Sequence, residues 1–212
     1  MEIAITAARS PQWHEARDFA RESYRAMYGA LTAPEPDIFV TVRERADGPV
    51  IACAGLSNAE QGTFFSEHYL KARIEDALTA VSPDPVRRGE VVEVGPLAGA
   101  GGAGQELIRL LPIIAWCQGK RFILATVTDR VRDLMSRLHV PFVPLAPADP
   151  AWMDTGERRT WGTYYDHTPT TGAVPLDNIG QLINSSTGRY SFSDLVVRTP
   201  VPLTEAVSGA HA

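Results

Sequence analysis

The stretch VVEVGPLAGAGGAG, residues 91–104, carries the strongest indication of how this chain folds. Its first half is an apolar strand candidate that ends near Ala98, and its second half is a glycine-rich loop. A helix-forming sequence follows from about Ala103. Such a loop presents unpaired backbone N–H groups and the positive end of a helix dipole, and this arrangement binds phosphate groups. The stretch therefore predicts a site for a phosphate-bearing molecule beside a strand that carries one acid, Glu93.

The flanking sequence alternates helical and strand patterns. Ser10-Pro11 is a typical helix start, with serine as the N-cap and proline at the first helical position. Ala46-Asp47-Gly48 joins two β-branched runs, which indicates a hairpin. The expected elements are a strand at 3–5, a helix from 11 to 28, the hairpin 37–44 and 50–56, a helix 64–81, the strand 91–98, a helix 103–118, a strand 121–127, a helix 129–138, a strand 140–145 and a short helix 178–184.

The glycines alone match a dinucleotide-binding pattern. Gly99, Gly101 and Gly104 have the G-x-G-x-x-G spacing between a strand and a helix, and Asp129 follows the next strand, where a ribose contact would lie. However, a hairpin precedes the pattern instead of βαβ units. Proline at position 96 removes a ladder hydrogen bond and predicts a bulge in the strand. A flexible loop without any ligand is a further alternative.

The element order fits a different phosphate-binding arrangement, that of the GNAT-type N-acyltransferases, which hold coenzyme A. In that fold class, α/β (α+β), a mixed and mostly antiparallel sheet is split at a bulged strand and covered by helices on both faces. The bulged strand would offer the backbone of Val94, Gly95 and Leu97 to the pantetheine arm of an acyl-CoA. The N–H groups of Gly101–Gln105 would then hold its pyrophosphate.

Several motifs resemble one known family in the same order along the chain. Residues 64–75, FFSEHYLKARIE, resemble the F-L-E-x-Y-L…I-E segment of the thermostable hemolysin family, and residues 91–98 resemble its I-V-E-V-G-N-L-A strand. The segments 125–128, 144–149 and 161–165 are also similar to motifs of that family. The resemblance covers residues 37–182 and implies a GNAT-like fold related to the acyl-homoserine-lactone synthases. Pro96 replaces the usual asparagine.

Acyl transfer to an amine needs a base and a proton donor for the leaving thiolate. Glu93 is the candidate base, because an acid in an apolar strand has a raised pKa when it points inward; the alternative is a solvent-facing or arginine-paired carboxylate. Tyr165, or its neighbour Tyr164, is the candidate donor. The acceptor pocket is expected from Phe65, His68, Tyr69, Trp161 and Tyr164, although core packing explains such residues equally well. The predicted coenzyme contacts are Val94, Gly95, Leu97, Gly99, Gly101, Gly102, Gly104 and Gln105.

The bulk properties predict a cytoplasmic protein with one domain at 1–198 and a flexible tail at 199–212. The chain has 212 residues, 44% of them hydrophobic, and a net charge of −5, which disfavours wide nucleic-acid binding. Cys53 and Cys117 are expected as reduced core residues, and Arg87-Arg88 and Arg158-Arg159 as solvated pairs. No metal site, signal peptide or membrane-inserting segment is indicated. The expected function is N-acyl transfer from acyl-CoA to a small amine. Open alternatives are an aminoacyl-tRNA or carrier-protein donor, a NAD-type oxidoreductase and a membrane-acting hemolysin. The aromatic residues after Pro147 would also suit a homodimer.

Overall fold

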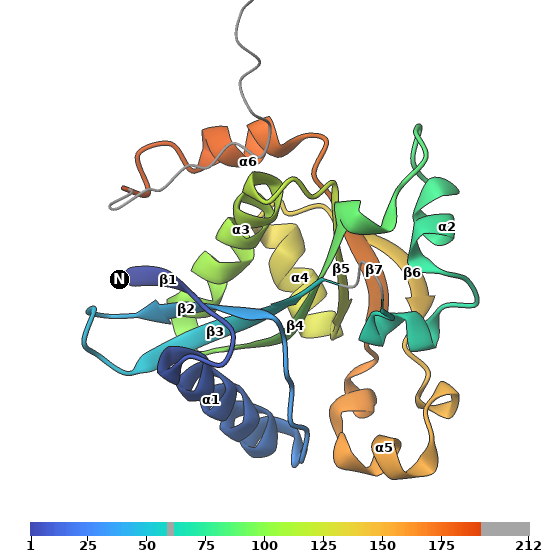
Figure 1. The fold of residues 1–212 in the computed structure, drawn as a ribbon, viewed down its shortest axis with the longest axis horizontal. Helices are drawn as coiled ribbons and strands as arrows, with labels where there is room; N and C mark the ends of the chain where they lie inside the picture. The colour runs from blue at the N-terminus through green and yellow to red at the C-terminus, as the bar shows by residue number, and fades with distance from the viewer. Residues whose placement is uncertain (59–61, 192–212) are drawn as a thin grey trace, which may run out of the picture.

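The fold is built on one seven-stranded mixed sheet. A computed structural model describes residues 1–58 and 62–191. The strands lie in the order β1-β2-β3-β4-β5-β7-β6 (Figure 1). Their bounds are β1 Glu2–Thr6, β2 Ile38–Arg43, β3 Val50–Ser57, β4 Val91–Gly99, β5 Phe122–Val127, β6 Val143–Pro147 and β7 Thr170–Pro175. The predicted tail at 199–212 lies outside the described residues, as does the end of the predicted domain at 192–198.

The helices α1, α3, α4 and α6 begin and end close to the predicted positions. Ser10 caps the first helix by accepting the N–H of Trp13 at 3.2 Å, with Pro11 at the first helical position, as predicted. The α-helices are α1 Pro11–Tyr28, α2 Ile74–Thr79, α3 Gly101–Cys117, α4 Asp129–Arg137, α5 Thr155–Thr160 and α6 Ile179–Ser185, and the 3₁₀ helices are η1 Phe65–Tyr69, η2 Arg88–Glu90, η3 Pro150–Trp152 and η4 Tyr164–His167.

The sheet is split beside β4. The strand β4 runs antiparallel to β3 along its length, but it pairs in parallel with β5 only from Val91 to Val94. All other neighbouring strands of the described sheet are antiparallel. Beyond Val94 the two central strands no longer pair, so the backbone of the second half of β4 has an edge without a strand partner. This opening is the split that the bulged strand predicted.

The bulge lies at Gly95-Pro96. Leu56 pairs with Val94 and Ala54 pairs with Leu97, so two residues of β4 oppose the single residue Gly55 of β3. A Cβ atom at position 55 would lie 2.7 Å from the carbonyl oxygen of Gly95 and 2.7 Å from Cγ of Pro36. Only glycine allows the backbone to approach this closely. The bulge is therefore supported from β3 as well as by the proline in β4.

Helices cover both faces of the sheet, as expected. Figure 1 shows α1 on one face and α3 with α4 on the other. The larger core lies under α3, α4 and α6 and includes Val92 and Ile123. On the opposite face, α1 packs through Trp13 and Ala16, while η1 and α2 form a separate core with β5. In β4, Glu93 lies between Val92 and Val94, whose side chains contact the larger core. Side chains alternate between the two faces along a strand, so the side chain of Glu93 points to the face where α1 and η1 lie.

The predicted helix at residues 64–81 is wrong as one element. The chain forms η1, leaves helical geometry at Leu70, and starts α2 at Ile74. Both helix starts are held by Glu67, whose carboxylate accepts the N–H groups of Phe64 and Ile74 at 2.8 Å each. Arg88 donates to the same carboxylate, and its side chain is only 10% exposed. Arg88 is therefore buried in an ion pair, which corrects the expectation of a solvated residue.

Three further predictions need correction. The strand β7 was not predicted, and it lies between β5 and β6 in the sheet. Its sequence, TTGAVP, is short and carries little apolar alternation. Helix α3 starts at Gly101, two residues before the predicted position, so the glycines belong to its first turn. Cys117 is exposed, whereas Cys53 is buried as expected, and both are free thiols.

Candidate active site

Glu93 occupies the point where β4 and β5 begin to separate. Its side chain is nearly buried, with 7% of the residue exposed. The N–H of Phe65 donates to Oε2 at 2.8 Å, and the N–H of Ser66 donates to Oε1 at 2.7 Å. These are the first residues of η1, so the carboxylate is held rigidly at the start of that helix. The local fold thus fixes both the position and the orientation of this acid.

Burial raises the pKa of Glu93 above its ordinary value, and this effect outweighs the hydrogen bonds from Ser66 and Phe65, which favour the ionised form. The nearby charge of Glu67 adds to the increase. No arginine or lysine forms an ion pair with Glu93 among the described residues, and Arg73 instead pairs with Glu75. A buried, unpaired carboxylate with a raised pKa is suited to accept a proton near neutral pH.

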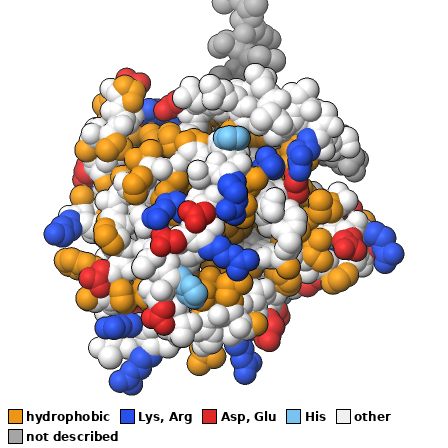
Figure 2. Space-filling model, turned by 180° about the vertical axis from the view of Figure 1, so that it is seen from behind, with side chains coloured by type: hydrophobic (Ala, Val, Ile, Leu, Met, Phe, Trp, Pro, Cys, Tyr) orange, Lys and Arg blue, Asp and Glu red, His pale blue; other side chains and the backbone are white. Residues whose placement is uncertain are grey.

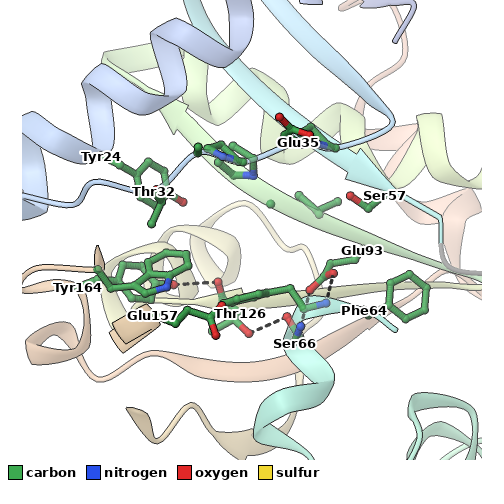
Figure 3. A pocket seen from close by; sticks show the side chains of 18 of the residues that line it. Tyr24, Thr32, Glu35, Ser57, Phe64, Ser66, Glu93, Thr126, Glu157 and Tyr164 are labelled. Atoms are coloured by element: carbon green, nitrogen blue, oxygen red, sulfur yellow. Dashed lines mark hydrogen bonds between the residues drawn. The ribbon is translucent and has the colours of Figure 1, made fainter. Parts of the chain in front are cut away.

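A cavity of about 520 Å³ opens over Glu93. One wall is formed by α1 and the connection from α1 to β2, and the opposite wall by η1 and the region from α5 to η4. The figure shows Tyr24 and Glu35 on one side and Ser66, Thr126, Glu157 and Tyr164 on the other (Figure 3). The two walls meet where the N–H of Leu31 donates to the carbonyl oxygen of Thr160 at 2.6 Å. The cavity therefore combines segments that are far apart in sequence.

Hydroxyl groups line the cavity beside the carboxylate. Ser66 Oγ lies 2.8 Å from Thr126 Oγ1, which in turn lies 2.7 Å from Thr171 Oγ1. The hydroxyl of Tyr164 donates to the carbonyl oxygen of Thr126 at 3.1 Å. Thr126 is the β5 residue just beyond the last parallel pair with β4, so this network marks the β5 side of the split. These hydroxyls give the cavity floor polar groups around Glu93.

Tyr24 of α1 reaches the bulged half of β4. Its hydroxyl oxygen accepts the N–H of Leu97 at 3.4 Å, and the residue lines the cavity with Gly95 and Pro96. Burial raises the pKa of Tyr24, so its hydroxyl stays protonated at neutral pH. The hydroxyl proton of Tyr24 is therefore available where β4 has no partner strand on its β5 side.

The glycine-rich run forms the start of α3. Ala100 is the N-cap residue and supplies no side-chain hydrogen bond, so the first N–H groups of α3 are not capped by a side chain. Gly101 has φ +57°, a conformation that side chains rarely adopt. A Cβ at Gly99 would lie 2.6 Å from Cβ of Ala52, so the loop also packs closely against β3. Gly101, Gly102 and Gln105 are exposed, as a site for a phosphate group requires.

The structure brings part of the predicted site together. The cavity is lined by seven of the predicted residues, namely Glu93, Val94, Gly95, Phe65, Tyr69, Trp161 and Tyr164. His68 is exposed outside this lining, and the hydroxyl of Tyr165 donates to Sδ of Met153 at 2.7 Å and lies beside that of Tyr69. Leu97 and Gly99, Gly101, Gly102, Gly104 and Gln105 belong to the end of β4 and the start of α3, not to the cavity wall.

Sequence reasoning missed Tyr24, Ser66, Thr126 and Glu157. Tyr24 lies on the apolar side of an amphipathic helix, which is equally typical of core residues. Ser66 was inside a quoted motif, but only its contact with β4 and β5 gives it a role. Glu157 lies in a polar segment without a recognisable pattern. The described residues contain no group of three or more His, Cys, Asp or Glu side chains that could hold a metal ion.

Within the described ranges, no helix is long and apolar enough to cross a membrane.

Among solved structures, TofI in an apo form is 15% identical with a TM-score of 0.56, and the match covers 86% of this chain and 97% of that chain. The CoA-dependent acyl-homoserine lactone synthase BjaI, with SAM and isopentyl-CoA, is 15% identical with a TM-score of 0.56 and 88% of each chain covered. The AHL synthase LasI is 13% identical with a TM-score of 0.53, and 83% of this chain and 91% of that chain are covered.

These similarities and the split sheet show a GNAT-like acyltransferase fold, as predicted. A search of curated proteins finds no significant match. A family model described as Thermostable hemolysin matches residues 6–179, which is most of the chain and agrees with the motifs in the sequence. The chain therefore belongs to the thermostable hemolysin family.

Proposed function

We propose that this protein is an N-acyltransferase that moves an acyl group from acyl-CoA to the amino group of a small amine. The observation that carries this proposal is the buried carboxylate of Glu93, held by two N–H groups at the split of the sheet and open to a cavity of about 520 Å³. Acyl transfer to an amine requires a positioned base, and the unpaired strand edge beside Glu93 leaves backbone groups available to a donor.

The donor is assigned from the two features that flank the split. The unpaired edge of β4 beyond Val94 offers backbone groups to an extended pantetheine arm, and the uncapped start of α3 offers N–H groups to a pyrophosphate. The thioester would then lie between α3 and the cavity, close to Leu97. The solved BjaI complex contains isopentyl-CoA, which supports a CoA thioester as the donor for this fold.

The reaction balances with the groups present. The substrate ammonium loses one proton to Glu93, directly or through a water, and the resulting amine attacks the thioester carbonyl. The C–N bond forms, the C–S bond breaks, and the nitrogen releases a second proton. One proton passes to solvent and the other to the leaving thiolate. Tyr24 is better placed than Tyr165 to protonate that thiolate, because its hydroxyl lies against Leu97 and Tyr165 does not line the cavity.

The alternative donor and the alternative functions find less support. A tRNA needs a basic surface for its phosphates, and the chain has a net charge of −5. Figure 2 shows Lys and Arg side chains interspersed with Asp and Glu on the face turned away from the view of Figure 1. A NAD-type oxidoreductase would use a parallel doubly wound sheet, whereas β4 and β5 are the one parallel pair among the described strands. The membrane-acting alternative has no structural feature in its favour among the residues described.

Thermal unfolding with coenzyme A, acyl-CoA, NAD and tRNA tests the donor. A ligand at 100 times its dissociation constant stabilises a folded protein by about 2.7 kcal/mol, so a CoA species is expected to raise the melting temperature clearly while NAD and tRNA leave it unchanged. Release of free thiol from acyl-CoA in the presence of amines then tests the reaction. Absence of both the shift and the thiol release for every CoA species would refute the proposed function.

A further inference from the structure

The charge of the cavity lining specifies the acceptor more closely. Three carboxylates face the cavity from three different segments: Glu35 from the α1–β2 connection, Glu93 from β4 and Glu157 from α5. The lining residues that the structure describes include no lysine, arginine or histidine. The charged side chains in the described lining are thus all acidic.

Two of these carboxylates have no partner in the protein. Glu93 accepts two backbone N–H groups, as described above. Glu35 is exposed at the rim and Glu157 is half-buried, and within the described ranges their carboxylates form no ion pair and accept no hydrogen bond. Figure 3 shows Glu35 and Glu157 on opposite sides of the cavity, with Glu93 between the two walls. A cationic ligand would therefore meet an acid at the reacting end and a second acid at either wall.

The remaining surface suits the carbon chain of such a ligand. Rings from both walls line the cavity, and Phe65 and Trp161 lie with their centroids 5.4 Å apart. Tyr24 and Tyr164 form a stacked pair with centroids 6.3 Å apart. Aromatic faces attract ammonium groups and cover methylene groups at the same time. A substrate carboxylate, by contrast, would find no cationic partner in the described lining and would lie near three like charges.

We infer that the acceptor is a di- or polyamine without a carboxylate group, bound with one ammonium at Glu93 and another at Glu157 or Glu35. The inference rests on the proposed function for the role of the amine as acyl acceptor. It adds what that function leaves open, namely that the substrate carries a second positive charge and that amino acids are excluded. The exclusion follows from the absence of a cationic group in the described lining, and the second charge follows from the two unpartnered acids.

Three five-carbon amines separate these features. 1,5-Diaminopentane has both ammonium groups, pentylamine lacks the second one, and lysine adds a carboxylate to the diamine. Binding of each to the full-length protein is measured by calorimetry, with and without saturating coenzyme A. We expect the dissociation constant of 1,5-diaminopentane to be about 5-fold lower than that of either analogue, because an ion pair at a half-exposed carboxylate contributes up to about 1 kcal/mol.

Charge-neutral variants locate the second ammonium. Glu157→Gln and Glu35→Gln keep the side-chain size, and at least one of them is expected to weaken diamine binding about 5-fold while changing pentylamine binding less than 2-fold. Glu44→Gln is the matched control, because Glu44 is exposed on the β2–β3 hairpin and does not line the cavity. It removes the same charge and should leave all three affinities unchanged.

The outcomes distinguish this inference from the proposed function. Equal or tighter binding of lysine, equal binding of pentylamine, or no binding of any amine would overturn the inference. Turnover of acyl-CoA with lysine ahead of the diamine would also overturn it and would leave the acyltransferase proposal standing. Conversely, the predicted amine ranking without any binding or turnover of CoA thioesters would support the amine site and refute the proposed donor.

Discussion

Replacement of Glu93 by glutamine separates the chemical role of this carboxylate from its structural one. The carboxylate accepts the N–H groups of Phe65 and Ser66 at 2.8 and 2.7 Å. Glutamine has one carbonyl oxygen, so it can retain one of these hydrogen bonds, and its NH₂ group then faces the other N–H. Leaving a buried donor unpaired costs about 1 to 3 kcal/mol. Removal of a buried charge offsets part of this cost, so we expect the free energy of unfolding to fall by about 1 to 2 kcal/mol.

The expected effect on turnover is larger. Loss of a general base lowers rates by about 10²- to 10⁴-fold, which corresponds to about 3 to 5 kcal/mol of activation free energy. A domain with a free energy of unfolding of about 5 kcal/mol or more stays almost entirely folded after the loss of 2 kcal/mol. Reduced activity in Glu93→Gln therefore reports the chemistry and not a loss of folded protein. Thiol release from acyl-CoA gives kcat, and urea unfolding gives the stability.

The pH dependence of Glu93→Gln provides a second measurement. Because burial raises the pKa of Glu93, the acidic limb of the wild-type rate profile should lie above the usual carboxyl range and should be lost in the variant. In the pH window between the ordinary and the raised pKa, the folded state binds a proton that the unfolded state has released. Wild-type stability, measured relative to Glu93→Gln, should therefore decrease as pH rises through that window.

Glu67→Gln is the matched structural control. Glu67 also accepts N–H groups at the start of η1 and is buried in the pair with Arg88, but it does not line the cavity. This substitution should destabilise the protein by about 1 to 3 kcal/mol, because Arg88 keeps its ion pair with Glu75, while kcat of the folded fraction stays within about 3-fold of wild type. Wild-type turnover in Glu93→Gln would refute the base assignment. An equal loss of kcat in both variants would show that the carboxylate acts only by positioning η1.

Three further substitutions test the remaining parts of the site. Tyr24→Phe should lower kcat about 10- to 100-fold with CoA thioesters. The loss should be much smaller with a thioester of an acidic aryl thiol, because a good leaving group does not need a proton donor. Equal losses with both donors would exclude Tyr24 as the acid. Gly102→Asp should weaken CoA binding about 10-fold while the melting temperature stays equal or rises slightly. An acid in the first turn of α3 stabilises the helix but repels a pyrophosphate. Unchanged CoA affinity by calorimetry would place the pyrophosphate elsewhere. Gly55→Ala should lower the free energy of unfolding in urea by about 1 to 3 kcal/mol, because the alanine Cβ would lie 2.7 Å from the carbonyl oxygen of Gly95. An unchanged urea midpoint would contradict the close packing at the bulge.

The features that could be predicted from the sequence are those with a local cause. Gly95-Pro96 breaks a strand wherever that strand lies, so the bulge and the split were predictable before any partner strand was known. The same holds for the capped start of α1 and for the β2–β3 hairpin, whose residues are close in sequence. Glu93 was identified because it is the one acid in an apolar strand, a pattern visible without tertiary contacts.

Contacts between distant segments decided the rest, and periodicity does not encode them. Glu67 accepts N–H groups at the starts of both η1 and α2, and Arg88, 21 residues away in sequence, pairs with its carboxylate. The strand β7 has little apolar alternation, yet it enters the sheet because β5 and β6 both present unpaired edges to it. Tyr24 meets Leu97 across 73 residues of sequence. The sequence by itself therefore determined the split strand and its acid. Only the tertiary structure brought the acidic and aromatic walls together around Glu93, because burial and charge pairing depend on neighbours that only the folded chain provides.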